Sequence, residues 1–194
     1  MADYTSGNFP LNSEQMHQNA LYIAKVLSTT SFYGIPKWSL NAIAGLLGNT
    51  QSESRHNPGA WQDYTVPEAG DDPSKKGYGL VQWTPYTKYF EWAAAGNISP
   101  SSMNTALQRL NYEAANHIQY YPTSAYPDTF LEFIESTKAP DYLGRAFLYN
   151  YERPLEPDPV TRGKQALYWF EYISGHKFKG KKKWMYYLKR KVVL

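Results

Sequence analysis

Apolar residues recur every three or four positions along most of this chain, which is the spacing of one face of an α-helix. The clearest stripes run from Met16 to Leu27, from Leu40 to Leu47 and from Met103 to Ile118. Ser13 and Ser39 stand where a side-chain oxygen can cap the first two of these helices. The pattern predicts a mainly α chain.

Proline is tolerated in the first turn of a helix, so a proline ahead of an apolar stretch marks a helix start. Three further helices are expected on this basis, over residues 86–95 after Pro85, 141–151 after Pro140 and 160–173 after Pro159. A shorter helix is expected over residues 128–137.

The stretch from Asn57 to Trp83 interrupts the helical pattern, because glycine and proline recur throughout it. It predicts a loop with short extended pieces or a small β-hairpin. Functional residues are often held on such loops above a rigid scaffold.

The charge of the 194-residue chain is unevenly distributed. Residues 1–174 hold 12 basic and 17 acidic residues, whereas residues 175–194 hold eight basic and no acidic residues. The net charge of +3 therefore combines an acidic body of −5 with a cationic tail of +8. We expect three parts: an N-terminal extension at 1–12, a main domain at 13–174 and a basic, aromatic tail at 175–194.

Composition excludes some kinds of site. The chain has no cysteine, which excludes a disulfide scaffold, thiolate metal sites and a cysteine nucleophile. We expect no secretory signal peptide, because the first residues lack a basic flank and an apolar core, and no membrane span. The 18 Tyr, 6 Trp and 8 Phe, with only 19% charged residues, suit a carbohydrate groove or a protein interface.

Glu53 is the candidate for acid catalysis. The helix begun at Ser39 should end near Ser54, since Arg55 to Gly59 form a strong stop. A carboxylate in a last helical turn meets the negative end of the helix dipole, and burial in a cleft would raise its pKa further. A general acid for glycoside cleavage needs such a raised pKa. The alternative is a solvated glutamate paired with Arg55.

Two other motifs are suited to binding a sugar. In the sequence GYGLVQWT at 77–84, Tyr78 and Trp83 supply ring faces and Gln82 supplies an amide. The motif YNYERP at 149–154 contains Tyr151 and ends a predicted helix. Each motif also has a purely structural interpretation, as a tight turn into a helix or a structural Glu-Arg pair.

Other catalytic signatures are missing. The sequence has no HExxH, GxxxxGK[ST], GxGxxG or GxSxG motif, and its four histidines are scattered. We therefore expect no metal and no cofactor. The remaining hypothesis is an enzyme whose catalytic groups are carboxyl side chains and whose substrate is extended and polar.

At these motifs the chain resembles the phage tail lysozyme family, which includes the lysozyme domain of the tail-knob protein of small podophages that infect Gram-positive bacteria. The resemblance rests on GLLGNTQSES at 45–54 followed by Asn57-Pro58, GYGLVQWTP at 77–85 and NYERP at 150–154, and it covers residues 13–174. It implies a lysozyme-like α+β fold that is mainly helical, and cleavage of β-1,4 bonds between N-acetylmuramic acid and N-acetylglucosamine in peptidoglycan.

The resemblance makes Glu53 the catalytic acid and places Tyr78, Gln82, Trp83 and Tyr151 in the substrate groove. It fixes no second carboxylate, for which Asp63, Asp71 and Asp72 are candidates. A lytic transglycosylase would need none, because the 6-hydroxyl of muramic acid attacks instead.

The resemblance also implies a virion location in a phage tail, where the enzyme would open the wall at infection. Expected partners are peptidoglycan and other tail proteins, with no nucleic acid. Residues 177–194 suit contact with an anionic wall polymer or a membrane. Two alternatives stay open: a free endolysin, and a catalytically silent wall-binding tail protein.

Overall fold

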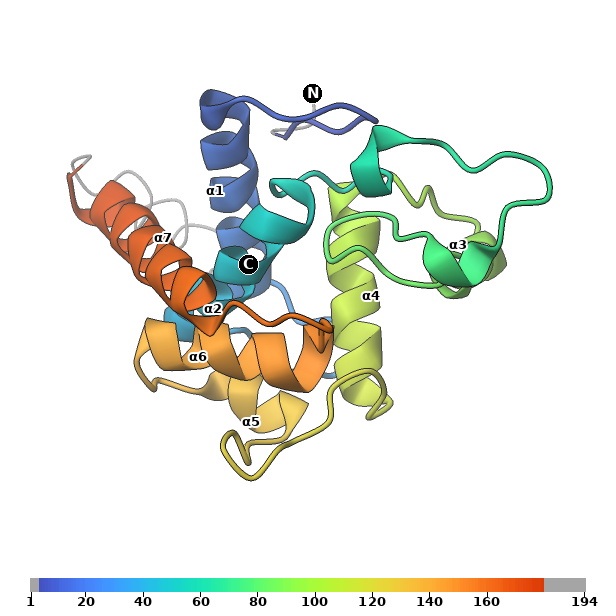
Figure 1. The fold of residues 1–194 in the computed structure, drawn as a ribbon. Coiled ribbons are helices and arrows are strands. Elements are labelled where there is room, and N and C mark those ends of the chain that lie inside the picture. The colour runs from blue at the N-terminus through green and yellow to red at the C-terminus, as the bar shows by residue number, and fades with distance from the viewer. Residues whose placement is uncertain (1–3, 180–194) are drawn as a thin grey trace.

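The computed structural model describes residues 4–179, with side chains from residue 4 to residue 175. The regular secondary structure of this part of the chain is almost wholly helical, arranged as Figure 1 shows. The α-helices are α1 (Ser13–Thr29), α2 (Leu40–Ser54), α3 (Thr87–Ala95), α4 (Met103–Ala115), α5 (Phe130–Glu135), α6 (Pro140–Phe147) and α7 (Pro159–Lys179). Two 3₁₀ turns, η1 (Gln62–Tyr64) and η2 (Pro73–Lys75), and a π-helical turn, η3 (Leu148–Glu152), complete them. The mainly α prediction is confirmed.

The segment at 57–83 is the irregular part that its glycines and prolines predict. In place of a regular hairpin it has two isolated antiparallel bridges, Trp61 with Tyr78 and Tyr78 with Trp83. Gly79 has φ +82°, a conformation that disfavours any side chain, so the turn between Tyr78 and Trp83 depends on this glycine.

Three details of the helix predictions are wrong. Asn12, not Ser13, caps α1, through a capping box in which its side chain and that of Gln15 each accept a backbone N–H at 2.9 Å. Tyr86, the expected first residue of the helix at 86–95, is the N-cap of α3, which begins at Thr87. Ile118 lies beyond the end of α4 and is exposed. In contrast, Ser39 caps α2 as expected.

Helix α2 lies at the centre of the helical body and packs against α1, α5, α6 and α7. Two glycines allow α7 to approach closely. A Cβ atom on Gly48 of α2 would lie 2.7 Å from the carbonyl oxygen of Arg162, and one on Gly144 of α6 would lie 2.8 Å from the same atom. This close packing brings the start of α7 to the C-terminal half of α2.

Helix α2 ends where the sequence predicts. Arg55 and His56 both adopt left-handed conformations, with φ of 56° and 62°. Their N–H groups donate to the carbonyls of Gln51 and Thr50 at 3.2 and 3.1 Å, which satisfies the last turn. The His56 ring is fully buried, and its Nδ1 lies 2.7 Å from Thr50 Oγ1.

His56 makes the stability of the fold depend on pH. Burial lowers the pKa of His56 from 6.5 to about 3, and its Nε2 has no hydrogen-bond partner within the described residues. His56 therefore becomes protonated near pH 6.5 in the unfolded chain but stays neutral in the folded chain. The free energy of unfolding consequently falls as the pH falls. We expect a loss of ~1.4 kcal/mol of unfolding free energy per pH unit between about pH 6 and pH 3 from this residue.

Urea unfolding at a series of pH values measures this dependence. The difference between wild type and His56→Gln isolates the contribution of His56 from those of the carboxyl groups. His117→Gln, at an exposed position, is the matched control and should leave the slope unchanged. Equal slopes for wild type and His56→Gln would contradict the prediction.

The predicted N-terminal extension is bound to the body where the structure describes it. Asn57 Nδ2 donates to the carbonyls of Gly7 and Phe9 at 2.7 and 2.8 Å, and Leu11 is buried. At the other end α7 continues past residue 174 to Lys179, and the rest of the predicted basic tail, residues 180–194, lies outside the described residues. No helix of the described part is long and apolar enough to cross a bilayer.

Candidate active site

Glu53 is the penultimate residue of α2, with its side chain 22% exposed. It lies at the carbonyl end of the helix, as the sequence predicts. Burial raises the pKa of Glu53 above its ordinary value, while the charge and hydrogen bond of Arg162 act in the opposite direction. A carboxyl group with a raised pKa can retain a proton closer to neutral pH.

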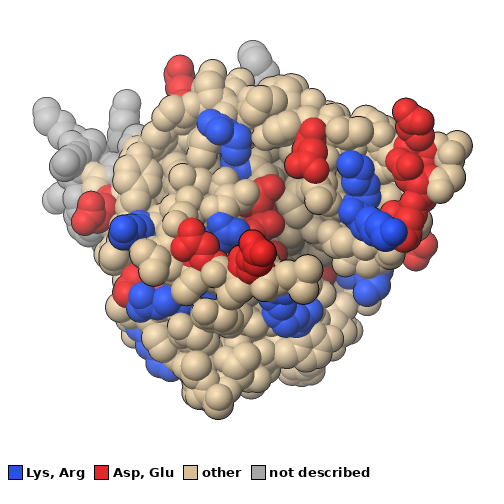
Figure 2. Space-filling view, viewed as in Figure 1, with Lys and Arg blue, Asp and Glu red and all other residues tan. Residues whose placement is uncertain are grey.

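Arg162, on the first turns of α7, is the partner of Glu53. Its Nη2 donates to Glu53 Oε1 at 2.6 Å, and its side chain is 13% exposed. The expected alternative pairing of Glu53 with Arg55 is wrong, because Arg55 Nε donates to the carbonyl of Leu11 instead. Figure 2 shows acidic and basic side chains gathered in the middle of this face, where Figure 1 has the end of α2 and the start of α7.

A second glutamate, Glu152, belongs to the same cluster. It ends the π-helical turn η3, and its Oε1 is buried with no partner among the described residues. Burial raises the pKa of Glu152 well above its ordinary value, the charge of Glu53 raises it further, and Arg162 opposes both. Within the region that the structure describes, the Arg162 side chain is hydrogen-bonded to Glu53 alone, and an uncharged, protonated Glu152 suits the buried position.

The glycine-rich motif is attached to the end of α2 beside Glu53. Ser54 Oγ donates to the carbonyl of Leu80 at 2.8 Å. Within the motif, Gln82 Nε2 donates to the carbonyls of Ala60 and Gly79, and the ring of Tyr78 is 5% exposed. Burial raises the pKa of Tyr78 to about 12. The structure therefore brings the motif to the catalytic candidate, with Tyr78 packed inward.

Trp83 and Tyr151 meet at a different carboxyl group, Glu113 of α4. Trp83 Nε1 donates to Glu113 Oε1 at 3.0 Å, and the Tyr151 hydroxyl donates to Glu113 Oε2 at 2.5 Å. Their ring faces are covered, because Trp83 stacks on Tyr89 and Tyr151 stacks on Phe147. Both rings lie in the core and hold Glu113, and their contact with substrate stays a prediction.

Arg109 completes this buried cluster. Its Nε donates to Glu113 Oε1 at 2.8 Å, one turn away on the same helix, and its guanidinium lies 5.4 Å from the ring centre of Trp92. Burial raises the pKa of Glu113, and the positive charge of Arg109 acts against this. The cluster of Glu113, Arg109, Trp83 and Tyr151 joins the glycine-rich motif, α4 and η3 behind the site.

Comparison with known proteins identifies the family. The phage tail lysozyme family matches residues 18–173, which is most of the chain and contains every element of the site. The chain belongs to this family. It is also similar to morphogenesis protein 1 of Bacillus phage B103, with 39% identity over 173 residues, or 89% of this chain. The chain spans less than half of that relative, 44% of its length.

The other carboxylates expected in this member of the lysozyme family lie in the irregular segment at 57–83 and are exposed. Asp71 Oδ2 accepts the N–H of Glu68 at 2.8 Å, and Asp72 Oδ1 accepts the N–H of Ser74 at 2.9 Å. The hydrogen bonds from Ser74 lower the pKa of Asp72. Asp63 is also exposed. Within residues 4–179 none of these three makes a hydrogen bond or ion pair with Glu53, and their catalytic role stays a prediction.

Sequence reasoning missed the partners of Glu53. Glu152 stands in the motif NYERP at 150–154, which carries part of the family resemblance. The sequence also allowed a purely structural role for the neighbouring pair Glu152-Arg153. Arg162 had no sequence signal, because its meeting with Glu53 depends on the packing of α7 against α2. No group of three or more His, Asp or Glu side chains in the described part of the chain could hold a metal ion.

Proposed function

We propose that this chain cleaves the glycan strands of peptidoglycan as a muramidase, with Glu53 as the general acid. The observation that carries the proposal is Glu53 itself. It stands half-buried at the carbonyl end of α2 with a raised pKa, in a member of the phage tail lysozyme family. The cleaved bond is the β-1,4 bond after N-acetylmuramic acid.

In the proposed reaction, Glu53 donates its proton to the glycosidic oxygen as the bond to the sugar breaks. A glycan strand across the site would exclude water and strengthen the retention of this proton. Arg162 fixes the orientation of the carboxyl group, and its charge then stabilises the Glu53 carboxylate that remains after proton transfer.

The fate of the sugar depends on the second reacting group. If water attacks, a hydrolase with a second carboxylate results, for which Asp63, Asp71 and Asp72 are the candidates. If the 6-hydroxyl of the muramic acid attacks, a lytic transglycosylase with the same Glu53 results. Because Glu152 favours the protonated form, its first role is to donate a hydrogen bond or hold a proton.

Mass spectrometry of fragments from purified peptidoglycan tests the proposal. We expect soluble fragments that end in a reducing N-acetylmuramic acid, because the proposed enzyme is a hydrolase. Fragments that end in a 1,6-anhydro sugar would replace hydrolysis with transglycosylation. Binding to peptidoglycan without release of glycan would instead favour a catalytically silent wall-binding protein.

The proposed place of action is the phage virion, at the start of infection. The family is one of tail lysozymes, and the similar protein of phage B103 is named a morphogenesis protein. Other tail proteins would then be its partners. Detection of the protein in purified virions supports this location, and its absence from virions would favour a free endolysin.

A further inference from the structure

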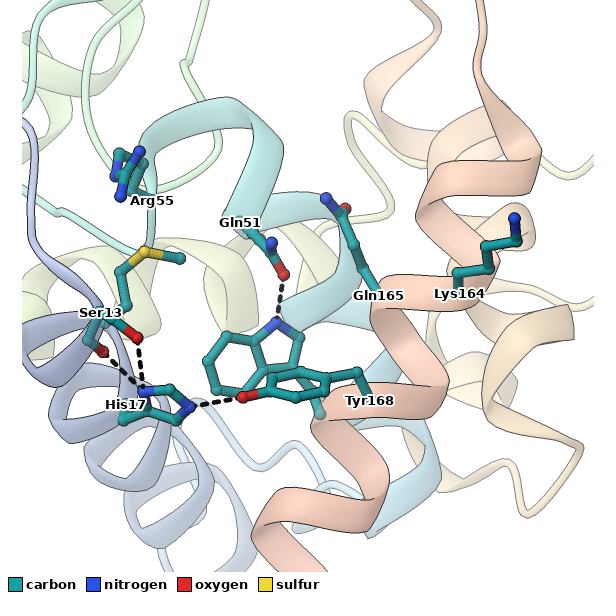
Figure 3. A pocket seen from close by; sticks show the side chains of 9 residues that line it. Ser13, His17, Gln51, Arg55, Lys164, Gln165 and Tyr168 are labelled. Atoms are coloured by element: carbon teal, nitrogen blue, oxygen red, sulfur yellow. Dashed lines mark hydrogen bonds between the residues drawn. The ribbon is translucent and has the colours of Figure 1, made fainter.

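A pocket of about 490 Å³ lies beside the glutamate cluster, between the start of α1, the end of α2 and the first half of α7. Figure 3 shows Arg55 and Lys164 on opposite sides of it, with Gln51 and Gln165 between them and with His17 and Tyr168 along its lower edge. The proposed chemistry does not use this pocket, although Gln51 in its wall belongs to the motif GLLGNTQSES at 45–54.

Hydrogen bonds between the residues that line the pocket already engage their acceptor atoms. Trp169 Nε1 donates to Gln51 Oε1 at 2.7 Å, so the oxygen of this amide is engaged and its nitrogen remains free. His17 Nδ1 lies 2.6 Å from the carbonyl of Ser13, which only accepts, so Nδ1 carries the hydrogen. In the neutral ring, Nε2 then accepts the hydroxyl of Tyr168 at 2.6 Å.

Several side chains around the pocket have N–H groups that no hydrogen bond among the described residues uses. Ser52 Oγ donates to Gln165 Oε1 at 2.9 Å, which leaves the amide nitrogen of Gln165 free as well. Arg55 uses only Nε, on the carbonyl of Leu11 at 2.7 Å. Lys164 is exposed and makes no ion pair with the described residues. Two cations and two amide nitrogens therefore line a space that suits an acceptor-rich anion.

The pocket and the catalytic candidate share a wall. Ser52, whose hydroxyl bonds Gln165, precedes Glu53 in α2, and Arg162 and Gln165 are one turn apart on α7. The Ser52–Gln165 contact therefore separates Glu53 from the pocket, and a side branch on a sugar bound at Glu53 would cross this contact to enter it. In peptidoglycan that branch is the peptide stem on muramic acid, which ends in carboxylate.

We propose that this pocket binds the carboxylate-bearing peptide stem of the peptidoglycan substrate. The inference rests on the proposed function, since it names a part of that substrate. Lys164 and Arg55 supply charge to the stem carboxylate, and the amides of Gln51 and Gln165 donate to its peptide carbonyls. The exposed ring of Tyr168 offers apolar surface to the stem side chains.

A binding experiment tests the pocket without requiring catalysis. N-acetylmuramoyl tetrapeptide, which has no bond for the enzyme to cut, is titrated while the Trp169 indole N–H is followed by NMR. We expect this signal to shift, because Trp169 bonds Gln51 in the pocket wall. Lys164→Glu should weaken binding about tenfold, since it replaces an attraction with a repulsion. Lys37→Glu, at another exposed lysine, is the matched control and should have no effect.

Two further ligands identify the anion. The same muramoyl peptide with amidated carboxylates should bind as weakly as the free peptide binds to Lys164→Glu. Tight binding of a glycerol phosphate oligomer without binding of the muramoyl peptide would overturn the proposal in favour of an anionic wall polymer. No shift of the Trp169 signal with the muramoyl peptide would also overturn it.

Kinetics separate this proposal from the proposed function. On peptidoglycan with intact stems, Lys164→Glu should raise KM about tenfold with little change in kcat. On glycan strands stripped of peptide, wild type and Lys164→Glu should be equal, and an equal loss on both substrates would contradict the stem assignment. If wild type cuts neither substrate, the proposed function fails while the binding result still stands.

Discussion

Glu53→Gln is expected to abolish the release of soluble glycan from peptidoglycan, with kcat lowered by about 10³-fold, because the amide has no acidic proton to transfer to the glycosidic oxygen. The fold should survive. Glutamine has the shape of glutamate, its carbonyl oxygen can still accept from Arg162 Nη2, and the position is partly open to solvent. Turbidity loss of purified walls and mass spectrometry of the products measure this effect.

Glu135→Gln is the matched control for this experiment. It makes the same chemical change at an exposed helix position on α5, and it should retain full activity. Circular dichroism and urea unfolding of both variants separate lost chemistry from lost structure. Wild-type rates of glycan release by a folded Glu53→Gln protein would exclude Glu53 as the acid.

The helices and the position of Glu53 could be predicted because they depend on local patterns. A repeat of three to four residues marks α1, α2 and α4, and Ser39 and the stop after Ser54 set the ends of α2. These signals are local in the chain, so no tertiary contact is needed to interpret them. They placed the candidate acid in its last helical turn.

The environment of Glu53 depends on contacts between distant segments and could not be predicted in the same way. Arg162 is 109 residues away in sequence and reaches Glu53 because Gly48 and Gly144 let α7 pack closely. Glu152 joins them only because η3 folds toward the same point. A sequence pattern names such residues but does not say which of them meet.

Aromatic residues were the least informative part of the sequence. Ring faces in the motifs at 77–84 and 149–154 suit a sugar, and they suit a protein core equally well. In the structure, Tyr78, Trp83 and Tyr151 are each at most 5% exposed. The exposed ring of Tyr168 lies on α7, outside both motifs, where helical spacing alone gave no reason to single it out.

The largest loss of stability is expected from Glu113→Ala. This change leaves the Arg109 side chain, which is 9% exposed, without its ion-pair partner, and it removes the acceptor of Trp83 Nε1 and of the Tyr151 hydroxyl. Breaking a buried ion pair from one side costs about 3–5 kcal/mol. Since whole domains are stable by only about 5–15 kcal/mol, the urea midpoint should fall steeply.

The i,i+4 pair of Asp141 and Arg145 on α6 provides the comparison, because it has the same helical spacing but is about one-third exposed. Asp141→Ala should change the urea midpoint little, since solvent already screens this pair. Glu113→Gln should lie between the two alanine variants, because it keeps an acceptor for Trp83 while it removes the charge that Arg109 needs. Similar midpoints for Glu113→Ala and Asp141→Ala would mean that the buried cluster adds no more stability than an exposed pair. If the urea midpoint of Glu113→Ala is much lower than that of Asp141→Ala, and Glu113→Gln recovers only part of the loss, most of the stabilisation comes from the buried charge. This charge would then be what keeps η3, α4 and the glycine-rich motif packed together.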